Sequence, residues 1–241
     1  LIRLAHRGRE FWLLGDLACQ TVEDRLKMYQ KWQHKVPGGM AWHTEHSERV
    51  RRLEDSDGDG RADHVTVFSE GYNRPEEGTG AGLMARDGKV YYACMPRLWV
   101  LEDHDDDGRA EDRTVLHDGF GVCNSLAHDL HGLTWGFDGK LYFSVGDHGY
   151  HVTTQEGETL HDPGVGAVFR CNSDGSELEV YARGLRNPHD LAFDQHGNLF
   201  TVDNNADVGD SPRLVYVVPG GNSGWQMSFE TIAGSYNPGP W

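Results

Sequence analysis

The sequence has few positive charges for its length. It carries 22 lysine and arginine residues against 38 aspartate and glutamate residues, which gives a formal net charge of −16. Nucleic acids and anionic membrane surfaces attract basic proteins, so this balance argues against both as partners. Long apolar runs are also absent, and no stretch approaches the roughly 18 residues that a membrane-spanning helix needs. We therefore expect no nucleic-acid partner and no membrane span in this chain.

Cysteine and proline are scarce as well. The four cysteines, Cys19, Cys94, Cys123 and Cys171, form no C-x-x-C pair, so the sequence indicates no zinc knuckle, no dithiol redox centre and no attached c-type haem. We expect them to be small core residues, with one disulfide as the alternative. Glycine, by contrast, is abundant at 31 residues beside 9 prolines, which suits a turn-rich β protein. The chain begins with Leu1 and carries no signal-peptide pattern, so we expect a trimmed or partial chain.

The sequence contains an internal repeat. LEDSDGDGRADHVTVFSEG, which starts at Leu53, matches LEDHDDDGRAEDRTVLHDG, which starts at Leu101, at an offset of 48 residues. A second motif, DGKVYYA, recurs in looser forms, with copies that start at Asp87, Asp138, His196 and Arg7. Units of about 50 residues, in which apolar strands alternate with turns rich in glycine and aspartate, are typical of β-propeller blades.

We therefore predict an all-β fold, a β-propeller of four-stranded antiparallel blades. Four blades are visible in the sequence, and they begin near Leu1, Gly82, His131 and His189. A β-sandwich is the second choice because it would not need the repeat. Residues 1–241 are expected to form a single, incomplete propeller domain. One helix is expected near residues 21–33, inside the first blade, because TVEDRLKMYQKWQ opens with a Thr-x-x-Asp capping box.

Blade topology sorts the loops onto two faces. The long connections, roughly residues 15–48, 146–166 and 203–212, share one face with the loops that enter the blades, residues 117–130 and 183–188. Long loops on a rigid scaffold usually carry binding and catalysis. The histidines expected on this face or at its rim are His43, His46, His128, His131, His148, His151, His161 and His189. The aspartate-rich turns should lie on the opposite face.

Two of these turns have the ligand spacing of a calcium loop. Each has the pattern Asp-x-Asp-x-Asp-Gly with a further acid at the ninth position, but threonine replaces the bidentate glutamate of an EF-hand at the twelfth. The predicted ligands of structural calcium are Asp55, Asp57, Asp59 and Asp63 in the first turn, and Asp103, Asp105, Asp107 and Glu111 in the second. A solvated turn without metal is the alternative.

The candidate active site lies where successive blades begin. His131 and His189 are equivalent in the repeat at an offset of 58, and each starts an innermost strand, so both should point toward the central channel. Arg186 and Asn187 directly precede His189, and a guanidinium there could clamp an anionic ligand. The segment DNNADVGD, from Asp203, offers carboxylate and amide oxygens for a cation near the same place.

Three stretches resemble a known family. HGLTWGFDGKLYFSVGD at His131, GLRNPHDLAFDQHGNLFTVDN at Gly184 and GGNSGW at Gly220 are similar to the soluble glucose/sorbosone dehydrogenases, propeller quinoproteins that use pyrroloquinoline quinone and calcium. The similarity is closer still to the membrane-bound dehydrogenase domains of planctomycete type, and it runs from about residue 50 to 226. The resemblance implies six blades, so this chain would hold an incomplete propeller.

The resemblance also implies roles for individual residues. His128 or His131 would be the catalytic base that takes the proton of the substrate hydroxyl while a hydride passes to the quinone. The cofactor-binding residues would be Arg186, Asn187, His189, Asn204 and Asn205. Of these, Asn204 and Asn205 would border the calcium ion.

These residues predict a quinoprotein-like dehydrogenase that oxidises a sugar or another alcohol. The family further implies a periplasmic or otherwise exported protein, with a c-type haem domain as electron acceptor. One alternative is a metal-dependent propeller lyase or hydrolase, in which the His-x-x-His pairs at 43/46, 128/131 or 148/151 ligate an ion. The other is a non-catalytic propeller that binds carbohydrate or protein.

Overall fold

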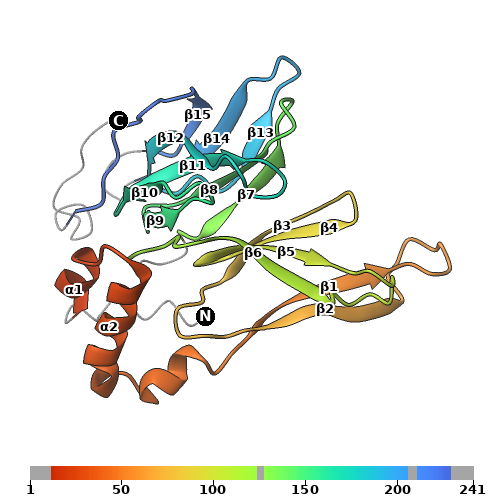
Figure 1. Ribbon diagram of the computed structural model, residues 1–241, viewed down its shortest axis with the longest axis horizontal. Coiled ribbons are helices and arrows are strands. Elements are labelled where there is room, and N and C mark those ends of the chain that lie inside the picture. The colour runs from red at the N-terminus through yellow and green to blue at the C-terminus, as the bar shows by residue number, and fades with distance from the viewer. Residues whose placement is uncertain (1–11, 124–127, 206–210, 229–241) are drawn as a thin grey trace.

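The computed structural model describes residues 12–123, 128–205 and 211–228, which are mostly antiparallel β-structure (Figure 1). Two sheets have four strands in sequential order, as predicted for propeller blades. The first contains β3 (Gly80–Arg86), β4 (Lys89–Cys94), β5 (Arg97–Glu102) and β6 (Asp112–Asp118). The second contains β7 (Leu130–Trp135), β8 (Leu141–Val145), β11 (Gly166–Cys171) and β12 (Glu179–Leu185).

A third sheet has three strands, β13 (Leu191–Phe193), β14 (Leu199–Asp203) and β15 (Arg213–Val217). Its first strand contacts β7, and β7 in turn contacts β3. The first strands of three successive sheets are therefore neighbours, which is the arrangement of innermost strands in a propeller. The described part of the chain does not close into a ring.

The first predicted blade is only partly present. Its described strands are the hairpin β1 (Glu48–Glu54) and β2 (His64–Tyr72). The loose repeat at Arg7 predicted a strand through Trp12 and Leu13, and this prediction is wrong, because α1 (Leu13–Leu17) begins there. The start of this blade, residues 1–11, lies outside the described residues.

The strand prediction failed because tertiary packing outweighed a weak sequence match. Trp12 is buried in a small cluster with Cys19, Met28 and Tyr29, and the last two belong to the neighbouring helix. A short helix places Trp12 against this cluster, and burial of such a large side chain stabilises the fold more than local strand propensity does.

The predicted helix is present as α2 (Val22–Trp32), followed by the short 3-10 turns η2 (Gln33–Lys35) and η3 (Gly39–His43). The Thr21 hydroxyl accepts a hydrogen bond from the backbone N–H of Asp24 at 3.1 Å, as the capping box predicted. The second long connection contains an unexpected hairpin, β9 (Tyr150–Thr153) and β10 (Thr159–Asp162). No helix in the described part of the chain has the length and apolar character of a membrane span.

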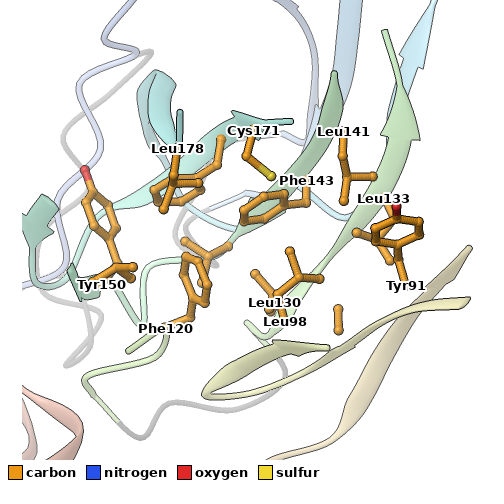
Figure 2. Packing of buried hydrophobic residues seen from close by; sticks show 14 of the residues in the cluster. Tyr91, Leu98, Phe120, Leu130, Leu133, Leu141, Phe143, Tyr150, Cys171 and Leu178 are labelled. Atoms are coloured by element: carbon orange, nitrogen blue, oxygen red, sulfur yellow. The ribbon is translucent and has the colours of Figure 1, made fainter. Parts of the chain in front are cut away.

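The main hydrophobic core lies between the two four-stranded sheets. Figure 2 shows Tyr91 and Leu98 of the first sheet packed near Leu141 and Phe143 of the second, with Phe120 from the connecting segment among them. A second cluster joins the β7–β12 sheet to the β13–β15 sheet. All four cysteines are buried and free, which confirms them as small core residues.

Candidate functional site

His131 is held rigidly at the start of β7. The residue is only 3% exposed, and its Nδ1 lies 2.6 Å from the backbone carbonyl oxygen of His189. That oxygen is an acceptor, so Nδ1 donates to it, and Nε2 lies 3.3 Å from the side-chain oxygen Oδ1 of Asn187. Burial lowers the pKa of His131 and so favours the neutral form.

The rings of His131 and His189 confirm that the two blades converge here. Their centroids are 4.5 Å apart, which fits the equivalence that the repeat predicted. Ser144 strengthens this junction, since its hydroxyl lies 3.1 Å from the carbonyl oxygen of His131 and 2.7 Å from that of Pro188. The start of one blade is thus tied directly to the start of the next.

His128 has a carboxylate partner that the sequence analysis missed. Its Nδ1 lies 2.5 Å from Asp147 Oδ1, while Trp225 Nε1 donates to Asp147 Oδ2 at 2.9 Å. Asp147 and Trp225 are buried, and the His128 side chain is 13% exposed. A carboxylate that accepts the Nδ1 proton orients the ring and leaves Nε2 free to take a proton from a substrate.

Asp203 fixes the loop that carries Arg186 and Asn187. It is fully buried at the end of β14, and its carboxylate accepts hydrogen bonds from both backbone N–H groups, at 3.0 Å from Arg186 and 2.6 Å from Asn187. Burial raises the pKa of Asp203, and these two hydrogen bonds partly offset that rise. Arg213 Nη2 adds a cation at 3.5 Å from the same carboxylate.

The Arg186 side chain joins the two groups of residues. One guanidinium nitrogen donates to the carbonyl oxygen of Asn205 at 2.5 Å, and the guanidinium lies over the Trp225 ring at 5.6 Å from its centroid. The carbonyl oxygen of Arg186 accepts from the backbone N–H of Asp147 at 2.7 Å. A continuous set of contacts therefore runs from His128 through Asp147 to Arg186 and Asn205.

Asn204 offers an oxygen suited to a cation. Its Oδ1 is buried and has no hydrogen-bond partner among the described residues. A buried amide oxygen without a donor is costly, and a hard cation such as calcium would satisfy it. The rest of the predicted segment, residues 206–210, lies outside the described residues.

The structure thus brings together His128, His131, Arg186, Asn187, His189 and Asn205, with Asn204 next to them in sequence. Their catalytic and cofactor-binding roles stay predictions. The sequence analysis missed Asp147 and Trp225, and it named Asp203 only as part of the cation-binding segment, not as the group that fixes the Arg186 loop. The signal for the two aspartates was their shared position, since each lies at or just beyond the end of the second strand of its sheet.

The other histidines predicted on this face do not all gather at the candidate site. His148 is buried and stacks on His128 at 5.9 Å, whereas His43 stacks on Tyr29 in the helical insertion. His151 and His161 face each other on the β9–β10 hairpin. Among the described residues, the groups of three or more ligand atoms that converge on one point come only from the two acidic turns. The alternative in which a His-x-x-His pair ligates a catalytic ion gains no support from this geometry.

The acidic turns lie at the end of the molecule away from α1, β9 and β10, as Figure 1 shows, which agrees with the opposite-face prediction. In the first turn the ligand atoms of Asp55, Asp57 and Asp59 converge. Asp63 is not part of this group, and its carboxylate accepts from the backbone N–H and the hydroxyl of Ser56.

The second turn is the better candidate for a cation. The ligand atoms of Asp103, Asp105, Asp107 and Glu111 all lie within 4.8 Å of one another. Asp103 Oδ1 is buried and has no hydrogen-bond partner among the described residues, so a bound cation would satisfy it. Arg52 Nη1 already lies 3.6 Å from the other oxygen of Asp103 and supplies part of the compensating charge.

The fold is similar to that of solved glucose dehydrogenases. A solved glucose dehydrogenase matches it with a TM-score of 0.55 and 19% identity, over 80% of this chain and 64% of that one. A second, described as a glucose dehydrogenase from Thermus thermophilus, has a TM-score of 0.50 and 22% identity, over 73% and 58% of the two chains. At these identities the likeness shows the fold.

Sequence comparison also finds a glucose dehydrogenase, and it identifies the family of this chain. Quinoprotein glucose dehydrogenase B of Acinetobacter calcoaceticus is 31% identical over 132 residues, which are 44% of this chain and 27% of that protein. The chain itself belongs to a family described as a domain of unknown function, DUF7133, which matches residues 26–222. The predicted resemblance to glucose dehydrogenases is confirmed, although the chain spans less than two thirds of each of these relatives.

Proposed function

We propose that this chain forms part of a quinoprotein-like dehydrogenase that oxidises a sugar or another alcohol. The observation that carries the proposal is the His128–Asp147 pair, in which a buried carboxylate orients an imidazole that remains partly exposed. Support also comes from the relative whose name includes both a quinoprotein and a glucose dehydrogenase.

His128 suits the role of base better than His131 does. A general base must reach the substrate hydroxyl within hydrogen-bond distance, so it needs an accessible nitrogen. His128 has 13% of its side chain exposed and its Nδ1 is satisfied by Asp147, so Nε2 can accept the hydroxyl proton. His131 is almost fully buried and contacts the His189 carbonyl and the Asn187 amide, so we assign it to hold the junction between the blades.

Arg186 and its neighbours suit a carboxylate-bearing quinone. A guanidinium forms two parallel hydrogen bonds with a carboxylate, and Arg186 is only partly buried beside the site. Asn187 and His189 border the same junction, and the orphaned oxygen of Asn204 fits a calcium ion near Asn205. When bound, pyrroloquinoline quinone would supply the hydride acceptor.

The wider context belongs to the same proposal. We infer a single propeller domain of which this chain holds part, an exported location, and a c-type haem domain as electron acceptor. These three inferences rest on the resemblance to the family.

The test is dye reduction by the full-length protein after addition of pyrroloquinoline quinone and calcium, with glucose and other aldoses as substrates. We expect turnover that needs both additions and that falls by about 10²–10⁴ in His128→Gln, the range typical of a lost general base. His64→Gln, on the distant β1–β2 hairpin, is the matched control and should keep full turnover. Carbohydrate binding without dye reduction by any substrate would instead favour a non-catalytic propeller.

A further inference from the structure

The β9–β10 hairpin carries a pair of histidines outside the proposed site. His151 and His161 are directly opposite each other in the strand register, and their Nδ1 atoms are 3.0 Å apart. The ring centroids are 4.9 Å apart at an interplanar angle of 75°. The two rings therefore present one nitrogen each to the same point in space.

That separation fits a hydrogen bond between the two rings, and it also lies in the range that two nitrogen ligands of one small metal ion span. Imidazole nitrogens bind zinc at about 2.0–2.1 Å, so two of them at a tetrahedral angle are about 3.3 Å apart, and in a square-planar arrangement about 2.9 Å. Imidazole suits zinc, nickel and copper, whereas calcium and magnesium prefer oxygen ligands. The geometry thus selects the chemical class of the ion.

The side chains beside the histidine pair can supply further ligands. Successive side chains of a strand point to opposite faces, so Asp162 and its partner Arg183, at 3.0 Å, lie on the face away from His161. On the histidine face the next cross-strand pair is Thr153 and Thr159, both exposed, whose hydroxyls or bound water can complete the coordination.

The backbone of the hairpin is also anchored next to the histidine pair. The backbone N–H of His151 donates to the carbonyl oxygen of Gly119 at 2.9 Å, and Tyr150 forms a bridge with Phe120. An anchored backbone limits the freedom of the histidine rings, so less entropy is lost when a metal binds.

We propose that His151 and His161 bind one divalent transition-metal ion, of the zinc, nickel and copper class. The site differs from the His-x-x-His hypothesis, because the partner of His151 comes from the opposite strand and His148 lies buried beside His128. The proposal does not rest on the dehydrogenase function, because its two ligands are not among the residues assigned to that chemistry.

The experiment is calorimetric titration of the chain, produced without a histidine tag, with zinc chloride at pH 7.5. We expect one equivalent to bind, with affinity at least tenfold weaker in His151→Gln and in His161→Gln. His196→Gln, which removes another exposed histidine, should bind like the parent, and magnesium chloride should give no signal that depends on the histidines. Affinity should also fall at pH 5.5, where protons compete for imidazole.

Histidine NMR signals of the parent protein provide a readout that needs no variant. Zinc should shift the ring resonances of His151 and His161 together, at one equivalent. If the two variants bind zinc as the parent does, or if the two resonances stay unmoved, the pair is an ordinary hydrogen bond between rings and the proposal is wrong.

Discussion

At the scale of single residues, the proposed role of His128 as a base depends on Asp147. Its two oxygens serve His128 and Trp225, so Asp147→Asn keeps the shape and removes the charge that stabilises a protonated ring. We expect kcat of the reconstituted full-length enzyme to fall by about 10²–10⁴ with little change in thermal stability. Asp63→Asn, in the distant first turn, is the control. Turnover equal to that of the parent would remove Asp147 from the proposed machinery.

A second residue, His117, makes the stability of the fold sensitive to acid. It is buried in β6, and burial lowers its pKa, so the unfolded chain binds a proton more readily than the folded chain does. Its contribution to stability is present above the ordinary histidine pKa and is lost as the pH falls through the lowered value. We expect urea unfolding to give a free energy that decreases from pH 6.5 toward pH 5, and less steeply in His117→Gln. Because burial also lowers the pKa of His131, some dependence should remain in that variant. Equal slopes for the two proteins would contradict this role of His117.

At the scale of elements, the acidic turns are expected to bind calcium for stability and not for turnover. Concentrated negative charge in the β1–β2 and β5–β6 turns destabilises the fold unless a cation relieves it. Calcium at about a hundred times its dissociation constant should raise the melting temperature by roughly 5–10 °C. The rise should shrink more in Asp105→Ala than in Asp57→Ala, because four carboxylates converge in the second turn and three in the first. If a chelator leaves the parent and the variant with both substitutions equally unmoved, both turns are ordinary solvated loops.

At the scale of the whole molecule, the β13–β15 sheet has one covered face and one open face. Leu199 is 1% exposed and packs against the β7–β12 sheet, whereas Leu214 on the other face is 73% exposed. In this chain Leu199→Ala should lower the free energy of unfolding by about 2–5 kcal/mol. Leu214→Ala should change it by less than about 0.5 kcal/mol. Urea denaturation of the two variants measures both effects.

The same pair of variants tests the proposal that the propeller is incomplete. Tyr142 and Phe200 occupy equivalent positions in successive blades. Tyr142 is buried because the next sheet packs against it. If a further blade covers the open face in a longer protein, Leu214→Ala there should cost as much as Leu199→Ala. A small effect in the longer protein as well would show that this face stays open.

The sequence alone determined the type of fold and the elements that depend on local pattern. The repeat predicted the two four-stranded sheets, because alternating apolar residues and turn residues act over a few positions. The capping box predicted α2 for the same reason. The equivalence of His131 and His189 followed from the repeat, since equivalent positions of adjacent blades lie near each other.

Only the tertiary structure decided which side chains meet. The contacts between His128 and Asp147, His131 and Asn187, and Trp225 and Asp147 join residues 19, 56 and 78 positions apart. Such contacts depend on strand register and on the packing of one sheet against the next, which short sequence patterns do not specify. The prediction of a strand at Trp12 and Leu13 was wrong for the same reason. Burial of Trp12 against α2 outweighed a weak local sequence match, and α1 forms there instead.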